Sequence, residues 1–170
     1  MISLQAGVIG VTGVTLRFAA MALACAAALG LALLAQYSFG MRPCPWCSLQ
    51  RVIYVAIATL GLLGSLITVR PVRLALATGV FVLAGLGAAS ALWQDLVAAK
   101  SSSCNLTLAD KVLNALGAET LLPWLFQVTA NCADSAVRVL GLAFETWSLA
   151  LYLMLALGAA STLLNLRRRV

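Results

Sequence analysis

Four long stretches of the chain contain no charged residue, and they set its hydrophobic pattern. They cover residues 18–41, 52–69, 74–94 and 146–166. Each is at least 18 residues long, which is enough for a helix to cross the hydrocarbon core of a bilayer. The pattern therefore predicts an all-α membrane protein, a four-transmembrane-helix bundle that forms one domain over residues 1–170.

The segments between these stretches predict the connections. A short loop lies near 42–51, and a very tight turn is expected near Arg70-Pro71-Val72-Arg73. A long loop covers about 95–145. The two loops join spans at the same end of the bundle, so they are expected on the same face of the membrane.

Composition supports lipid as the main solvent of the chain. Hydrophobic residues make up 63% and charged residues 9%, whereas a water-soluble domain has roughly 25% charged residues. A separate soluble domain is therefore excluded. The net charge of +6 is explained by basic residues that flank the membrane spans on the cytoplasmic side, and no nucleic-acid partner is expected.

The charged residues predict the orientation. All five acidic residues lie on the side of the two loops, and they offset the basic residues there: Arg42, Arg51, Lys100, Lys111 and Arg138. The opposite side carries only basic residues, in short segments: Arg17, Arg70, Arg73, Arg167, Arg168 and Arg169. Because basic residues in short segments stay on the cytoplasmic side, both termini are expected to be cytoplasmic.

Four of the five cysteines fall in the two loops. Cys44 and Cys47 form Cys-Pro-Trp-Cys in the short loop, and Cys104 and Cys132 bracket 27 residues of the long loop. Thiols on the outer face meet an oxidising compartment, so two disulfides are expected, in any of three connectivities. Zinc is the alternative use of four thiolates, but the wide separation of Cys104 and Cys132 disfavours it. Cys25, inside the first span, is interpreted as a small buried packing residue.

The Cys-Pro-Trp-Cys motif stands where the second span begins. Pro45 suits the first turn of a helix, which puts Cys47 near a helix N-terminus, where backbone N–H groups stabilise a thiolate. Arg51 follows four residues later on the same helical face. A bridge across so short a loop would stabilise little by constraining the unfolded chain, so the arrangement favours redox chemistry. Histidine is absent, which excludes imidazole-based catalysis.

The long loop contains one clear helix signal. Thr107 and Asp110 have the spacing of a capping box, an apolar stripe follows, and Gly117 is a plausible end of the helix. The apolar character of this helix predicts that it lies on the membrane surface, packs against the bundle, or does both.

With these features together, the chain resembles the bacterial disulfide bond formation protein B (DsbB) family. The resemblance rests on the four spans, on Pro-Cys-Pro-Trp-Cys-Ser-Leu-Gln-Arg at 43–51, and on a long second loop with Cys104 and Cys132. It implies a multi-pass protein of the bacterial inner membrane with periplasmic loops. The implied activity is that of a dithiol:quinone oxidoreductase, which reoxidises a DsbA-like periplasmic thiol oxidase and passes the electrons to ubiquinone or menaquinone.

The resemblance also implies roles for individual residues. Cys104 would receive the attack of the reduced partner, and Cys132 would be its disulfide mate. Cys44 would exchange with this loop pair. Cys47 would be the thiolate facing the quinone, and Arg51 would lie at the quinone head group.

Two departures from the family accompany these matches. Gln50 stands where several relatives have glutamate, and no histidine lies near the outer end of the third span, so the resemblance assigns no proton path. Two alternatives remain open. One is a quinone reductase like the vitamin K epoxide reductase family, which usually has the reverse order of cysteine pairs. The other is a non-enzymatic four-span scaffold with structural disulfides, which has no need of Arg51.

Overall fold

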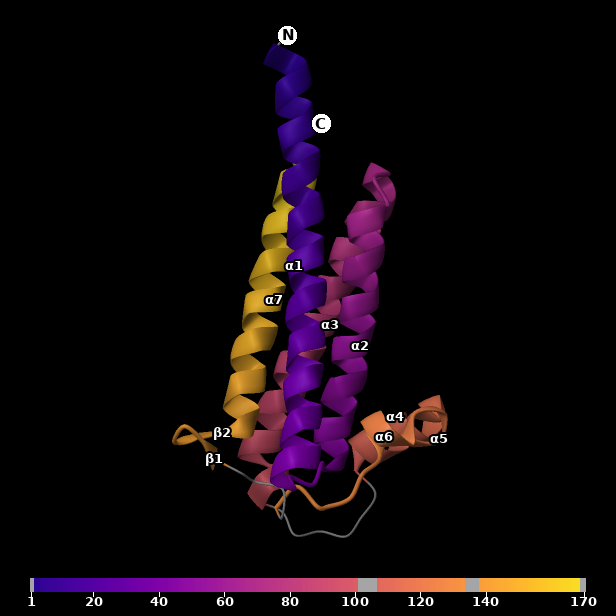
Figure 1. Ribbon diagram of the computed structural model, residues 1–170, viewed down its shortest axis with the longest axis vertical. Coiled ribbons are helices and arrows are strands. Elements are labelled where there is room, and N and C mark those ends of the chain that lie inside the picture. The colour runs from indigo at the N-terminus through magenta and orange to yellow at the C-terminus, as the bar shows by residue number, and fades with distance from the viewer. Residues whose placement is uncertain (1, 101–106, 134–137, 169–170) are drawn as a thin grey trace.

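Four long helices run side by side as a bundle in the computed structural model, which describes residues 2–100, 107–133 and 138–168 (Figure 1). They are α1 (Ile2–Phe39), α2 (Pro45–Leu66), α3 (Arg70–Leu96) and α7 (Phe144–Arg167). All four are long and apolar enough to cross a membrane. Helix α2 packs between α1 and α3, and α3 packs along α7. The predicted four-helix membrane bundle is confirmed.

Each long helix begins before the charge-free stretch that predicted it. Helix α2 already begins at Pro45, before Arg51, and ends at Leu66. The tight turn lies at residues 67–69, earlier than predicted, and Arg70-Pro71-Val72-Arg73 forms the first turn of α3. The turn was predicted near these four residues, and it lies directly before them. Proline near the start of a helix explains the difference, because its fixed φ suits that position and its missing N–H has no helical partner there.

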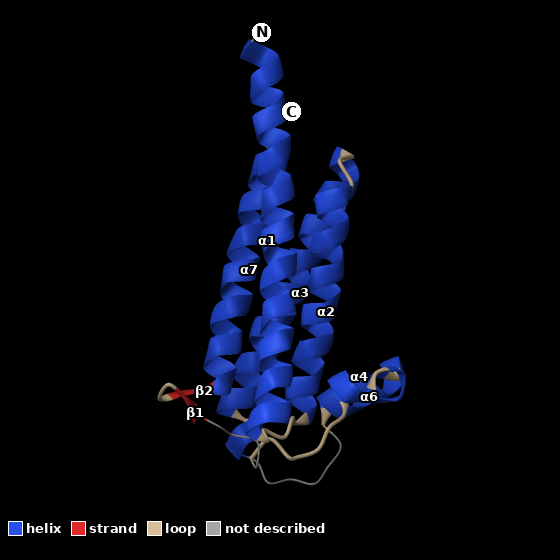
Figure 2. Cartoon of the chain, viewed as in Figure 1, coloured by secondary structure: helices blue, strands red, loops and turns tan. Residues whose placement is uncertain are grey.

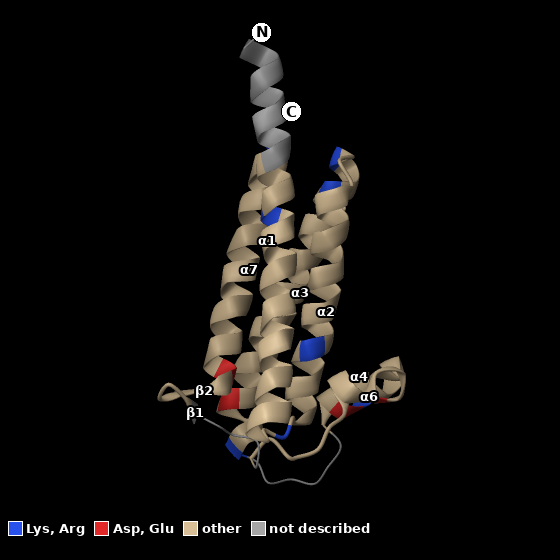
Figure 3. Ribbon diagram, in the orientation of Figure 1, with Lys and Arg blue, Asp and Glu red and all other residues tan. Residues whose placement is uncertain are grey.

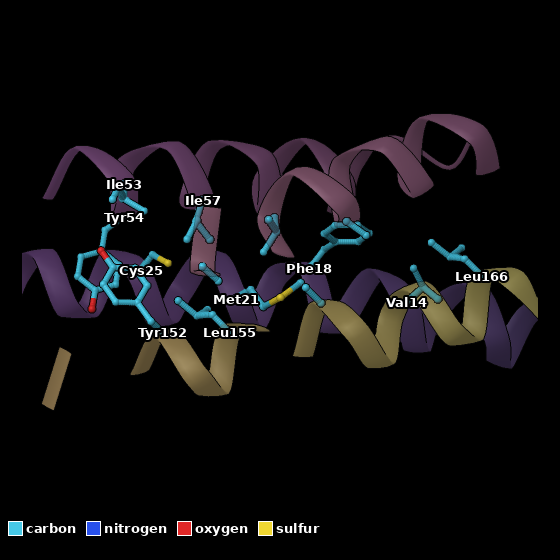
Figure 4. Packing of buried hydrophobic residues seen from close by; sticks show 14 residues of the cluster. Val14, Phe18, Met21, Cys25, Ile53, Tyr54, Ile57, Tyr152, Leu155 and Leu166 are labelled. Atoms are coloured by element: carbon cyan, nitrogen blue, oxygen red, sulfur yellow. The ribbon is translucent and has the colours of Figure 1, made fainter. Parts of the chain in front are cut away.

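The core of the bundle is apolar and closely packed. Phe18, Cys25 and Ile57 are fully buried there, so the packing role predicted for Cys25 is confirmed (Figure 4). The rings of Tyr54 and Tyr152 stack with their centroids 4.5 Å apart. Large leucines and other apolar side chains are exposed on the outer surface of the bundle, as expected where lipid is the solvent.

Three short helices form the middle of the long loop: α4 (Leu108–Leu116), α5 (Ala118–Leu121) and α6 (Pro123–Phe126). Helix α4 begins with the predicted capping box, because Thr107 and Asp110 each accept a hydrogen bond from the other's backbone N–H. It ends at Gly117, whose φ of 60° lies in the left-handed region. The buried side chains of Leu125 and Phe126 pack with the bundle. The predicted helix is confirmed, and it packs against the bundle.

Two short elements were not predicted. A single 3-10 turn, η1 (Ala98–Lys100), follows α3. A two-stranded antiparallel hairpin, β1 (Arg138–Val139) and β2 (Leu142–Ala143), precedes α7 and is the small red element in Figure 2. Its turn residues Leu140 and Gly141 both have positive φ, as a two-residue hairpin turn requires.

Charge is distributed unequally between the two ends of the bundle. In Figure 3 the acidic residues gather at the end that carries α4 and the hairpin. At the other end, arginine side chains tie helix ends together: Arg70 donates to the carbonyl of Leu166, and Arg73 donates to Thr15. The start of α1 and the end of α7 lie at this second end (Figure 1).

Candidate redox site

Cys44 and Cys47 occupy the start of α2. Cys44 is the N-cap residue in extended conformation, and its sulfur accepts a hydrogen bond from the backbone N–H of Cys47 at 3.3 Å. Pro45 begins the helix because it needs no N–H partner there. The sequence predicted that the helix N-terminus would favour a thiolate at Cys47; in the structure the N–H group points at the sulfur of Cys44.

Three cysteine sulfurs come together at this helix start. The sulfur atoms of Cys44 and Cys47 are 2.8 Å apart. The thiol of Cys44 also forms a hydrogen bond with that of Cys132, from the long loop. Cys44 and Cys132 form one buried cluster with Trp46 and Ala109, and Cys47 packs against it. The sequence could not indicate which loop cysteine approaches the Cys-Pro-Trp-Cys motif; among the described residues of the long loop, Cys132 does so.

Backbone hydrogen bonds hold the long loop against the short one. The N–H groups of Thr129 and Ala130 both donate to the carbonyl oxygen of Pro43, at 3.0 and 3.3 Å. These bonds are close in sequence to Cys132 and to Cys44, so they fix the approach of the two thiols. Cys104, the other predicted site cysteine of the long loop, lies outside the described residues.

The hydrogen bond between Cys44 and Cys132 makes the two thiols unequal. Cys44 donates, so the bond, together with burial, raises the pKa of its thiol to about 12. Cys132 accepts, and this bond lowers the pKa of its thiol from the ordinary value of 9.0. A thiolate is the nucleophile in disulfide exchange. Cys132 is therefore the better nucleophile of this pair.

Arg51 is buried one turn below Cys47. Its guanidinium donates to the side-chain oxygen of Gln36 at 2.7 Å and to the carbonyl of Leu125 at 2.8 Å. A longer bond of 3.4 Å reaches the carbonyl of Ala32. All the hydrogen bonds described for Arg51 end on uncharged oxygens, so its charge is not neutralised by direct contact. Arg51 of α2 therefore joins this helix to α1 and to α6.

A cavity of about 300 Å³ lies beside these residues. Cys47 and Arg51 of α2 line it, and Leu31, exposed on the outer surface of α1, lines it too. Most of the wall from α1 is small and apolar, made of Ala24, Ala27, Ala28, Ala32 and Ala35. The cavity thus combines a thiol, a buried cation and an apolar wall at the loop end of the bundle.

A larger groove of about 1190 Å³ lies on another face, between α2, α3 and α4. Cys132, Trp46 and Trp93 line it, but neither Cys47 nor Arg51 does. The smaller cavity therefore places a buried cation and an apolar wall next to the Cys47 thiol. The larger groove borders the Cys132 thiol.

Sequence reasoning missed a set of polar side chains that line the smaller cavity. The amide nitrogen of Gln94, near the end of α3, donates to the sulfur of Cys47 at 3.3 Å and to a carboxylate oxygen of Glu145 at 3.3 Å. Gln50 donates to Gln94 at 2.8 Å. The sequence does place Gln94 and Glu145 at the boundaries of charge-free stretches. Polar residues are common at the ends of membrane spans, so this position alone did not indicate a site.

Comparison with known proteins gives a consistent result. The family described as "Disulfide bond formation protein DsbB" matches residues 15–162. The chain is 31% identical over 147 residues to Disulfide bond formation protein B 1 of Pseudomonas savastanoi pv. phaseolicola, covering 85% of this chain and 86% of that protein. It is 32% identical over 140 residues to Disulfide bond formation protein B of Herminiimonas arsenicoxydans, covering 81% and 87%. The chain belongs to the DsbB family of disulfide bond formation proteins.

Proposed function

We propose that this protein is a quinone-dependent dithiol oxidase of the inner membrane that reoxidises a DsbA-like periplasmic thiol oxidase. Family membership supports disulfide bond formation as its general activity. The observation that carries the finer proposal is the line of sulfurs from Cys132 through Cys44 to Cys47, which ends at the cavity beside Arg51. Such a line moves electrons by disulfide exchange from a loop to the membrane.

The residues around the small cavity fit a quinone. The alanines of α1 leave room for a flat ring, and the guanidinium of Arg51 offers hydrogen-bond donors to a carbonyl oxygen. A quinone bound there would supply a two-electron acceptor that dissolves in the bilayer. Cys47 and Arg51 would hold its head group, with Gln94 as a further polar neighbour.

The thiols would act in sequence. A thiolate of the reduced partner attacks Cys104 of a Cys104–Cys132 disulfide and releases Cys132 as a thiolate. Cys132 then attacks Cys44 of the Cys44–Cys47 disulfide, and the pair Cys44–Cys132 forms while Cys47 leaves as a thiolate facing the cavity. The lowered pKa of Cys132 and its contact with Cys44 support this order.

The proposal includes an orientation. Four membrane spans and family membership place the protein in the inner membrane. We place both termini in the cytoplasm and both loops in the periplasm. The acidic residues at the loop end and the short arginine-rich segments at the other end support this orientation.

One observation keeps the scaffold alternative open. Arg51 holds α1 through Gln36 and α6 through Leu125, which is a structural task that a scaffold would also need. Arg51 therefore distinguishes the two functions less sharply than the sequence indicated. The converging sulfurs distinguish them better, since a scaffold needs no thiol between two disulfides.

The test is catalysis by the purified protein. Mixed with a short-chain quinone and a reduced periplasmic dithiol protein, it should consume many equivalents of quinone. Cys47→Ser and Cys104→Ser should each abolish turnover, and Cys25→Ala should not, because Cys25 lies in the bundle core. A wild-type protein that consumes no quinone, with Cys44–Cys47 resistant to dithiothreitol in the folded state, would support the scaffold.

A further inference from the structure

The Cys47 sulfur has two hydrogen-bonding neighbours among the described residues. One is the Cys44 sulfur, 2.8 Å away, and the other is the side-chain nitrogen of Gln94, 3.3 Å away. Gln94 lies near the end of α3 and is 3% exposed, so its amide is buried beside the motif. The backbone N–H of Cys47 points at Cys44, so this donor of the helix start serves the other sulfur.

The proposed exchange step changes the neighbours of Cys47. When the Cys132 thiolate attacks Cys44, the Cys44–Cys47 bond breaks and a Cys44–Cys132 bond forms. The electron pair of the broken bond stays on Cys47, so no proton is transferred. Cys44 then has no thiol hydrogen to donate, and the hydrogen bonds described for Arg51 end on oxygens. Gln94 is therefore the described hydrogen-bond donor that remains at the Cys47 thiolate.

A chain of polar groups sets the direction of the Gln94 amide. Its nitrogen carries two hydrogens, and a carboxylate oxygen of Glu145 accepts the second at 3.3 Å. Its oxygen accepts from the Gln50 nitrogen at 2.8 Å, and the Gln50 oxygen accepts from the Ser148 hydroxyl. A reversed amide would put oxygen against the Glu145 oxygen and nitrogen against the Gln50 nitrogen. The contacts on both sides therefore select the orientation in which an N–H faces Cys47.

We infer that Gln94 stabilises the Cys47 thiolate released by disulfide exchange, and that Gln50 is a positioning residue that acts through Gln94. The inference rests on the proposed function, because it concerns one step of the proposed relay. A hydrogen bond to a charged group stabilises more than one to a neutral group, and a neutral sulfur is a weak acceptor. The Gln94 bond therefore favours the released thiolate over the closed Cys44–Cys47 disulfide.

The test measures how one disulfide partitions in the full-length Cys104→Ser protein, free of quinone and with one disulfide per chain. The disulfide is either Cys44–Cys47, which leaves Cys132 free, or Cys44–Cys132, which leaves Cys47 free. Acid stops the exchange, and N-ethylmaleimide in denaturant then labels the free thiols, which tandem mass spectrometry assigns. The ratio of label on Cys47 to label on Cys132 reports the equilibrium. Cys25, which is free, is the internal standard.

Two variants and a matched control decide the roles. Gln94→Met keeps the length of the side chain but removes the amide, so the label ratio should fall about tenfold. Gln50→Met leaves the Gln94 amide without its orienting donor, so the ratio should fall about threefold. Ser90→Ala, one turn before Gln94 on α3, removes a buried hydroxyl whose described hydrogen bond stays within the helix, and it should leave the ratio unchanged. An unchanged ratio in either methionine variant, or an equal fall in Ser90→Ala, would overturn the inference.

A second readout needs neither the relay nor quinone. The reduction potential of the Cys44–Cys47 pair can be measured in glutathione buffers with the Cys104→Ser/Cys132→Ser protein. Gln94→Met should make this potential about 30 mV more negative, which corresponds to a tenfold change in the equilibrium constant, because the donor favours the reduced pair. An unchanged potential would overturn the inference. A reference protein that never carries label on Cys47 would contradict the proposed relay instead, and the potential would still decide the role of Gln94.

Discussion

The order in which the two contacting loop thiols ionise can be predicted in detail. Cys44 donates its proton toward Cys132, which raises the pKa of Cys44 to about 12 and lowers that of Cys132 below 9.0. At pH 8 the thiolate fraction of Cys44 is then about 10⁻⁴, and that of Cys132 is above about 0.1. As pH rises, Cys132 should titrate first in the reduced protein.

The difference in alkylation rate is smaller than the difference in thiolate fraction, because a thiolate of lower pKa is a weaker nucleophile. With a Brønsted coefficient of about 0.5, a thousandfold difference in thiolate becomes roughly a 30-fold difference in rate. Iodoacetamide labelling of the reduced protein at pH 8, mapped by mass spectrometry, should show Cys132 ahead of Cys44 by this factor. Cys25, fully buried in the core, provides the unreactive internal reference.

A variant tests the cause. Cys44→Ala removes the donated hydrogen bond, so the labelling of Cys132 should move toward the pH of an ordinary thiol, near 9. Equal labelling rates at Cys44 and Cys132 in the wild type, or a Cys132 profile indifferent to Cys44→Ala, would refute the reasoning about this pair.

Three further predictions concern Arg51, the packing of the bundle and the orientation of the protein in the membrane. Arg51→Ala should lower the free energy of unfolding in mixed micelles by about 3 kcal/mol, because two short hydrogen bonds from a charged group are lost. It should also weaken quinone binding about tenfold. Arg51→Lys should recover only part of both effects, and unchanged values in Arg51→Ala would contradict the role of Arg51. Gly87→Ala should destabilise the protein by about 1–3 kcal/mol, since its Cβ would lie 2.2 Å from the ring of Tyr152. Gly85→Ala is the control, because its Cβ would have no neighbour within 4 Å. Equal effects of the two substitutions would contradict the packing of α3 on α7. Reduced Cys104 should react with an impermeant maleimide from the periplasm while tags at both termini stay cytoplasmic, and labelling from the cytoplasm would overturn the orientation.

Much of the architecture could be predicted because it depends on local patterns. Charge-free stretches identify the spans, since a charged side chain is costly in hydrocarbon. Pro45 marks the start of α2, and Thr107 with Asp110 marks the start of α4. In each case the physical cause lies within a few residues, so the sequence alone carries it.

The contacts that give the site its chemistry could not be predicted in this way. The meeting of Cys132 with Cys44 depends on Pro43 accepting two hydrogen bonds from the long loop, which is a tertiary feature. Gln94 and Glu145 are far apart in sequence, and only the packing of α3 on α7 brings them together. The turn at 67–69 lies a few residues before the predicted centre, because the charges of Arg70 and Arg73 were taken to end a helix, although charged residues also occur in the first turn of a helix.

The central claim is that all four loop thiols pass their electrons to quinone through Cys47. The most direct measurement is a titration of the fully reduced protein, without any partner, by a short-chain quinone followed by absorbance. Four thiols form two disulfides, so the wild type should consume two equivalents of quinone. Cys104→Ser, which keeps only the Cys44–Cys47 pair complete, should consume one, and Cys47→Ser should consume none. Consumption of one equivalent by Cys47→Ser, through a disulfide among its three remaining loop thiols, or of none by the wild type, would contradict the account.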